Sequence, residues 1–230
     1  YLRPLRDKMR KTHRMIEQHL VNKKPLNQKA LISSRESILK PLRVVRESLE
    51  ETQNENIASG ELLDLMRRAK CFGINLARLD IRQESSRHTK LITEIVKRKF
   101  KKNYNSWTEE EKIKFLSKKI KGKNFFKNIQ FKDKENLEVW LTFKELARQP
   151  KECLGAYIIS MTSSASDILS VILLQKEANI KDKLRVVPLF ETLDDLINGG
   201  KIMSSLYKLK WYRNLIKHNR EIMIGYSDSS

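Results

Sequence analysis

The chain has 230 residues, of which 40% are hydrophobic and 33% charged, with only 7 glycines and 5 prolines. This composition is typical of a globular protein and excludes a low-complexity or fibrous chain. The 47 lysines and arginines against 28 aspartates and glutamates give a net charge of +19, a field that would attract nucleic acid, anionic membrane surfaces or phosphorylated metabolites.

Two cysteines, Cys71 and Cys153, are too few for a disulfide framework and fit a reducing compartment. No apolar run approaches the roughly 20 residues of a membrane span, so we expect a cytoplasmic protein without a membrane partner. The chain starts at Tyr1 rather than Met and stops at Ser230 shortly after an apolar run, which indicates a piece of a longer protein.

The first part of the chain, residues 1–60, is predicted to be helical because charged and apolar residues alternate at three- and four-residue steps. From Gly60 a second pattern recurs four times: a helical segment, a turn, a short apolar run and a polar cluster. The predicted helices are Glu61–Cys71, Leu137–Arg148, Ile168–Ala178 and a segment that starts at Thr192. The predicted strands are Ile74–Arg82, Ala156–Met161, Leu184–Phe190 and Glu221–Tyr226.

Alternation of apolar strands with helices is the signature of βαβ units and a parallel sheet. The predicted fold class is therefore helix-rich α/β: a partial (β/α)8 TIM-like barrel of about four parallel strands over residues 61–230. A basic helical insertion at about 98–137 interrupts it. Capping boxes are expected at Thr108–Glu111, Ser164–Asp167 and Thr192–Asp195. Arg78 and Asp80 are predicted to form an ion pair inside the barrel.

The insertion has two interpretations. Lys97–Lys127 holds 12 basic and 3 acidic residues, a net charge of +9, together with six aromatic side chains, and this content is typical of a nucleic-acid surface. However, Ile113, Leu116 and Ile120 recur at helical spacing. They favour an apolar seam, packed on the rest of the protein, beneath a solvated lysine face. A basic helical nucleic-acid-binding module remains the alternative function.

In parallel α/β folds the active site lies where the strands end. The residues at the predicted strand ends are Arg82, Met161, Glu191 and Asp228. Two carboxylates suit Mg²⁺, which keeps waters and is completed by substrate oxygens, and an arginine grips phosphate or carboxylate. Either carboxylate alone could simply be a helix N-terminal acid. The two together with an arginine favour a metal and anion site.

Four segments at these strand ends carry a resemblance: Leu79–Thr89, Gly155–Met161, Val187–Leu196 and Gly225–Ser229. In order and approximate spacing they resemble the signature segments of phosphoenolpyruvate carboxylase. The resemblance is specific over Glu61–Ser230, looser over the first 60 residues and weak in the insertion. It suggests the first half of that family's catalytic barrel.

The resemblance implies an enzyme that joins phosphoenolpyruvate to bicarbonate and forms oxaloacetate and phosphate, with Mg²⁺ or Mn²⁺ required. By motif position, Glu191 and Asp228 match the family's metal-binding carboxylates, and Arg82 matches an arginine that binds the substrate phosphate. In the family mechanism bicarbonate attacks the phosphoryl group, giving carboxyphosphate and the enolate of pyruvate, before the carbon–carbon bond forms. Family members are usually homotetramers, and the resemblance implies no nucleic-acid partner.

The sequence also departs from the family pattern. Ala165 stands where the family often has proline, and Ser230 where it usually has glycine. The chain lacks the lysine that follows the Gly-Tyr-Ser-Asp motif, the upstream catalytic histidine, and the later strands with their arginines and histidine. We therefore expect these 230 residues alone to be inactive, and to associate through open sheet edges.

Overall fold

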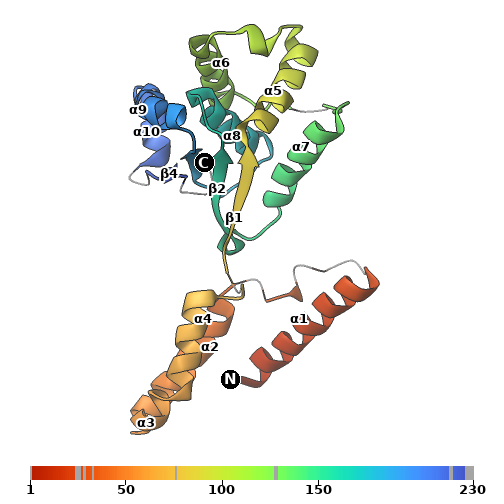
Figure 1. The fold of residues 1–230 in the computed structure, drawn as a ribbon. Coiled ribbons are helices and arrows are strands. Elements are labelled where there is room, and N and C mark those ends of the chain that lie inside the picture. Colours follow the sequence, from red (N-terminus) through yellow and green to blue (C-terminus); the bar gives the residue numbers. More distant parts are fainter. Residues whose placement is uncertain are drawn as a thin grey trace. The chain divides into compact units, whose positions relative to one another are not determined.

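The computed structural model describes residues 2–23, 27, 30–32, 34–75, 77–126, 129–217 and 220–225. The chain divides into two compact units, Tyr1–Arg78 and Leu79–Ser230 (Figure 1). Within the described residues, none of the helices has both the length and the apolar character needed to cross a bilayer.

The first unit is helical, as predicted. Its helices are α1 (Leu2–Asn22), α2 (Glu36–Glu51), α3 (Glu55–Ala58) and α4 (Glu61–Phe72). Helix α2 packs against the other three and buries Leu39 and Leu42. The Arg35 guanidinium donates to the Lys70 carbonyl at 2.8 Å and so ties the start of α2 to the end of α4. Gly73 ends α4 with a φ of +64°, a backbone conformation that glycine adopts without strain.

The division between the units lies at Arg78, whereas the sequence pattern placed the start of the barrel segment at residue 61. Helix α4 was expected to be the first helix of that segment. In the structure it packs against α2 and α3, and its buried residue is Ala69. The apolar side of α4 is thus covered by the helices that precede it in the chain.

The second unit is built on a parallel sheet of four strands in the order β1-β2-β3-β4. The strands are β1 (Leu79–Glu84), β2 (Leu154–Ser160), β3 (Val186–Phe190) and β4 (Met223–Ile224). Its α-helices are α5 (Ser85–Phe100), α6 (Glu109–Lys121), α7 (Lys134–Leu146), α8 (Ala165–Glu177), α9 (Leu193–Tyr207) and α10 (Lys210–Ile216). The predicted helix-rich α/β class with a four-stranded parallel sheet is confirmed.

Two predicted strands have different limits in the structure. Strand β1 begins at Leu79 rather than Ile74, because the alternation of polar and apolar residues starts only there, and it continues to Glu84. Arg82 therefore lies within the strand, two residues before its end. Strand β4 comprises only Met223–Ile224, although the Gly225 amide still donates to the Phe190 carbonyl at 2.9 Å. The predicted end of that strand, Tyr226, lies outside the described residues.

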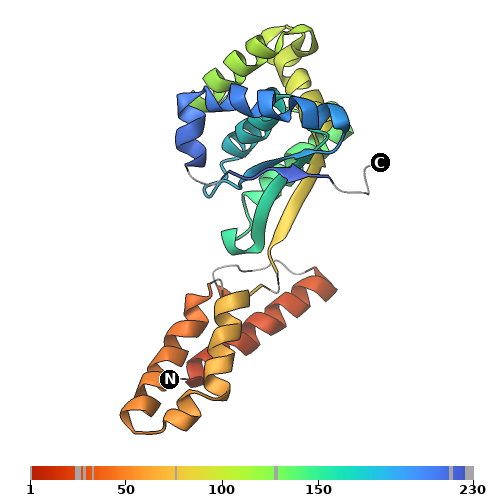
Figure 2. The same ribbon diagram turned by 60° about the vertical axis from the view of Figure 1, so that its left-hand side comes forward.

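The two faces of the sheet differ. Tyr157, Ile159 and Phe190 belong to the main core. The ribbon of this unit shows helices packed along the sheet (Figure 2). Helix α8 is the centre of that core, with twelve buried residues. The opposite face carries a small cluster of Ala156, Ile158, Val187 and Leu189, with Met223 beside it. Parallel strands with apolar residues on both faces occur in sheets that are covered on both sides.

The insertion packs as an apolar seam, as its helical spacing predicted. Leu116 is fully buried, and Ile113, Phe115 and Ile120 pack against the main core. The Lys119 ammonium lies 4.4 to 5.6 Å from the ring centroids of three phenylalanines. These three rings contact one another in edge-to-face and tilted arrangements beneath the lysine, so they are not displayed for stacking on bases. Nothing in this arrangement favours the nucleic-acid alternative.

All three predicted capping boxes are present, and they fix where α6, α8 and α9 begin. The Asp195 carboxylate accepts from the Thr192 amide at 3.1 Å, and the Asp167 carboxylate accepts from the Ser164 amide at 2.9 Å. Both carboxylates are buried and committed to the backbone, which agrees with the capping role predicted for Asp195. Asp194 lies in the first turn of α9 and is exposed.

Candidate active site at the strand ends

The carboxyl ends of β1, β2 and β3 lie at the same edge of the sheet because the strands are parallel. Met161 follows β2 directly and joins the three ends. Its amide donates to Glu191 Oε2 at 3.0 Å, and its carbonyl accepts from Ser85 Oγ at 2.6 Å. Ser85 follows β1 and Glu191 follows β3. We call this three-residue arrangement the strand-end junction.

At the strand-end junction Met161 itself adopts an uncommon backbone conformation, with a φ of +52°. This is unusual for a side chain with a Cβ atom and is maintained by contacts on both sides. The Thr162 hydroxyl donates back to the Ile159 carbonyl at 2.8 Å, so the turn after β2 is fixed from within as well. Glu191 is consequently presented by a rigid edge rather than by a free loop.

Only one oxygen of the Glu191 carboxylate has a hydrogen-bond partner among the described residues. Oε2 accepts the Met161 amide, and within the described part of the chain Oε1 has no hydrogen-bond or ion-pair partner. The side chain is half-buried. A partly desolvated carboxylate oxygen at the end of a strand is a suitable hard ligand for a divalent cation.

Arg82 lies on the sheet face opposite the main core. It is opposite Ile158 in the register of β1 and β2, and its Nη2 atom lies 3.9 Å from Met223 Sδ on β4. The guanidinium therefore reaches across this face from the first strand to the fourth. The described residues give it no carboxylate partner, so apart from the Nη2 contact with Met223 its N–H donors remain available for an anion.

Asp228, the second predicted metal ligand, lies outside the described residues, as do the neighbouring Ser227 and Ser229. Among the residues that are described, no group of three or more histidine, cysteine, aspartate or glutamate side chains could hold a metal. A Mg²⁺ site of the predicted kind needs only one or two carboxylates, with water and substrate as the other ligands. Glu191, with one fixed and one open oxygen, fits such a site.

The structure does not show the predicted ion pair between Arg78 and Asp80, both of which it describes; Asp80 makes a different contact. Its Oδ1 atom accepts from the Ala156 amide at 2.7 Å, where the register between β1 and β2 shifts. The carboxylate thus replaces a backbone acceptor at an irregular point of the ladder. This role depends on a local register shift, which alternation in the sequence does not reveal.

Gly155 makes room for that carboxylate, and substituting it should destabilise the sheet. A Cβ atom at this position would lie 2.1 Å from Asp80 Oδ1, so Gly155→Ala must expel the carboxylate and leave the Ala156 amide without its acceptor. We expect a loss of about 1–3 kcal/mol in the free energy of unfolding, measured by urea denaturation. Gly200→Ala is the control, because nothing lies within 4 Å of its Cβ position. An unchanged unfolding midpoint in Gly155→Ala would contradict this account.

Sequence reasoning missed a buried polar network behind Arg82. The Tyr157 hydroxyl donates to Gln83 Oε1 at 2.7 Å, so it accepts from His88 Nε2 at 2.8 Å. The network links β1, β2 and α5, and its Gln83 is the residue that follows Arg82 on β1. Its members come from separate motifs with no shared spacing, and only the sheet register brings them together.

His88 is completely buried, and this burial together with the nearby Arg87 charge lowers its pKa to about 3. The unfolded chain, with an ordinary histidine pKa of 6.5, takes up the proton first as the pH falls. The contribution of neutral His88 to the free energy of unfolding is therefore complete above pH 6.5 and is lost as the pH falls from 6.5 to about 3.

We expect this one group to lower the free energy of unfolding by about 2 kcal/mol between pH 7 and pH 5. The measurement is urea unfolding at the two pH values for the unmodified protein and for His88→Gln. Between the two pH values, the free energy of unfolding of the variant should fall by about 2 kcal/mol less than that of the unmodified protein. The carboxylates and the other histidines are common to both proteins and cancel in the comparison. Equal pH dependence in the two proteins would mean that His88 takes up its proton as readily in the folded chain as in the unfolded chain.

Comparison with known proteins places the chain among related sequences. The family model described as phosphoenolpyruvate carboxylase matches residues 1–230. Curated relatives named phosphoenolpyruvate carboxylase include those of Acinetobacter baumannii, 41% identical over 238 residues, and Marinobacter nauticus, 43% identical over 230 residues. Each match covers 100% of this chain and 26% of the relative. The chain thus spans about a quarter of the length of these relatives.

Proposed function

Because the chain belongs to the phosphoenolpyruvate carboxylase family, we propose that it contributes part of the active site of an enzyme that joins phosphoenolpyruvate to bicarbonate, forming oxaloacetate and phosphate. The observation that carries the proposal is the strand-end junction, which fixes Glu191 at the edge where three parallel strands end. Parallel α/β folds place their reactive groups at this edge.

The four strands would form half of an eight-stranded barrel. In such barrels the inward positions are filled by branched aliphatic residues, and Ile158, Val187 and Leu189 supply these on the face opposite the main core. The remaining strands and the remaining reactive groups would come from the rest of a polypeptide about four times as long, as in the relatives.

Arg82 would bind the phosphoryl group of phosphoenolpyruvate. Its guanidinium is planar and always charged, and it can hold two phosphoryl oxygens at once. The absence of a carboxylate partner among the described residues supports this role, since a neutralised guanidinium would hold an anion less tightly. As charge moves onto the phosphoryl oxygens during transfer, the same donors stabilise it.

Glu191 and Asp228 would hold Mg²⁺ or Mn²⁺, with water and substrate oxygens as the other ligands. When bound, the ion would supply Lewis-acid stabilisation of negative charge that develops on substrate oxygen. The Met161 amide keeps the Glu191 carboxylate oriented through Oε2 and leaves Oε1 for the ion.

The test is bicarbonate- and Mg²⁺-dependent formation of oxaloacetate from phosphoenolpyruvate by the complete polypeptide and by its Arg82→Gln variant. We expect the variant to lose about 10²-fold in kcat/KM, through both a higher KM and a lower kcat, because a charge-assisted contact with phosphate is removed from the ground state and the transition state. Arg78→Gln, four residues earlier in the chain, is the control for the change in charge. Equal activity of the Arg82 variant would remove Arg82 from the substrate site. A folded complete polypeptide that forms no oxaloacetate would contradict the proposed reaction.

A further inference from the structure

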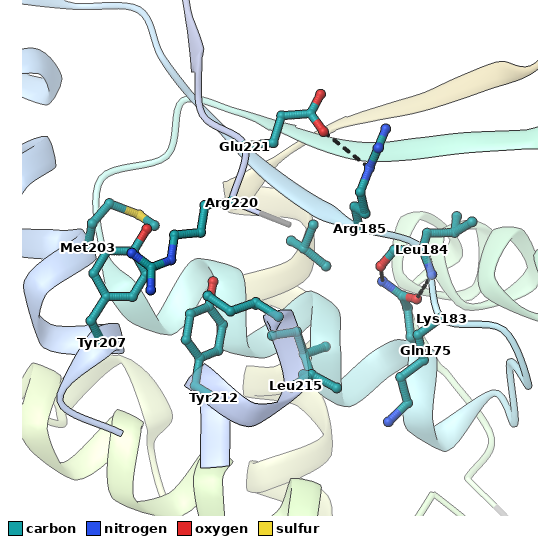
Figure 3. Close-up of a pocket in the computed structure, with 13 residues that line it drawn as sticks. Gln175, Lys183, Leu184, Arg185, Met203, Tyr207, Tyr212, Leu215, Arg220 and Glu221 are labelled. Atoms are coloured by element: carbon teal, nitrogen blue, oxygen red, sulfur yellow. Dashed lines mark hydrogen bonds and ion pairs between the residues drawn. The ribbon is translucent and has the colours of Figure 1, made fainter. Parts of the chain in front are cut away.

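A small cavity lies at the opposite end of the strands from the strand-end junction. Its volume is about 170 Å³. Lys183–Val186 and Arg220–Glu221, which line it, lead into β3 and β4, whereas Glu191 follows β3. The five residues of β3 separate the two ends by roughly 15 Å, at about 3.3 Å per residue. Figure 3 shows the cavity and its lining side chains.

The floor of the cavity is apolar and its rim is charged. Ile172 and Met203 are buried, and Leu215 closes one side. One wall is held in place by Gln175, whose side-chain amide exchanges two hydrogen bonds with the Leu184 backbone, at 2.7 and 3.2 Å. This part of the cavity is therefore already formed without a ligand.

The charges at the rim do not cancel. Arg185 and Glu221 form an ion pair at 3.1 Å, which leaves Arg220 and Lys183 as excess positive charge. The Arg220 guanidinium lies over the Tyr207 ring, 5.1 Å from its centroid, and the described residues give it no carboxylate. This cation–π contact holds the guanidinium beside the ring and leaves its N–H donors available.

Tyr212 adds a neutral donor next to this arginine. The side chain is buried, and burial together with nearby Tyr207 raises its pKa to about 12, so the hydroxyl keeps its proton at neutral pH. The described part of the chain gives that hydroxyl no hydrogen-bond partner. Figure 3 shows Tyr207, Tyr212 and Arg220 on the same side of the cavity.

We propose that this cavity binds a small organic carboxylate with an aromatic or branched aliphatic body. A cavity of about 150 Å³ with apolar walls accommodates benzene, so the body would fill the space beside Met203 and Leu215. The carboxylate would meet the Arg220 guanidinium and the Tyr212 hydroxyl. The site is separate from the proposed catalytic edge and does not depend on the reaction carried out there.

Benzoate is the probe, and its binding to the complete polypeptide is measured by ligand-observed NMR and calorimetric titration. We expect a Kd on the order of 1 mM or tighter, which is within what nine non-hydrogen atoms can supply. Arg220→Gln should weaken binding roughly tenfold or more, since it removes a charge-assisted hydrogen bond. Tyr212→Phe keeps the shape of the cavity and should weaken binding about threefold to tenfold.

The matched control is Arg213→Gln, which removes the same charge from an exposed position on α10 outside the cavity. It should leave benzoate binding unchanged. Benzyl alcohol, which has the same ring without the charge, should bind at least tenfold more weakly than benzoate. The proposal is overturned if benzoate does not bind, if Arg213→Gln weakens binding as much as Arg220→Gln, or if benzyl alcohol binds as tightly as benzoate.

Discussion

Glu191→Gln in the complete polypeptide should lower the rate of oxaloacetate formation on the order of 10³-fold while leaving the fold intact. Glutamine retains an oxygen that can accept the Met161 amide, so the strand-end junction should survive the substitution. What is lost is the negative charge that would hold the divalent ion. Lewis-acid stabilisation by such an ion contributes several kcal/mol, which corresponds to about that factor in rate.

Mn²⁺ binding, followed by electron paramagnetic resonance, separates a metal role from a purely structural one. Glu191→Gln and Asp228→Asn should both weaken Mn²⁺ binding, whereas Asp194→Asn, an exposed acid in the first turn of α9, should not. Circular dichroism of each variant confirms folding. Full activity together with unchanged Mn²⁺ affinity in Glu191→Gln would place the ion elsewhere and leave Glu191 as a helix N-terminal acid.

The sequence predicted the sheet because its strands and helix starts carry local signals. The apolar runs of β2 and β3 and the capping boxes of α8 and α9 lie next to one another in the chain, so periodicity and capping chemistry identify them. The limits of β1 were less accurate. The segment from Ile74 to Arg78 lacks the regular alternation that marks the strand from Leu79 onward.

The charged members of the candidate site could be proposed from the sequence, but the residues that position them could not. Arg82 and Glu191 are the residue types that anion and metal chemistry requires, and they stand out at or near strand ends. Met161 and Ser85 act through backbone atoms and one hydroxyl, and nothing in their identity indicates this. The hydrogen bond between Tyr157 and His88 joins residues 69 positions apart, and only the packing of α5 on the sheet brings them together.

One buried carboxylate of the core adds polar contacts to the apolar seam that attaches the basic insertion. The Glu177 side chain is fully buried at the end of α8, and its Oε2 atom accepts from the amides of Phe125 and Phe126, both at 2.9 Å. Oε1 accepts from Lys176 at 2.8 Å, and the same ammonium also donates to the Lys119 carbonyl at the end of α6. One carboxylate therefore satisfies two backbone donors and one cation.

Glu177→Ala should open the insertion locally, because it leaves the amides of Phe125 and Phe126 without their acceptor and the largely buried Lys176 ammonium without its negative partner. Removing one partner from a buried ionic contact costs about 3–5 kcal/mol. We therefore expect the amides of α6 to exchange with solvent at least about 10²-fold faster, measured by hydrogen–deuterium exchange of the complete polypeptide. Glu152→Ala, an exposed glutamate before β2, should leave this exchange unchanged. If α6 remained equally protected in Glu177→Ala, the apolar seam and the hydrogen bonds from Ser166 to Glu109 would be sufficient to hold the insertion in place.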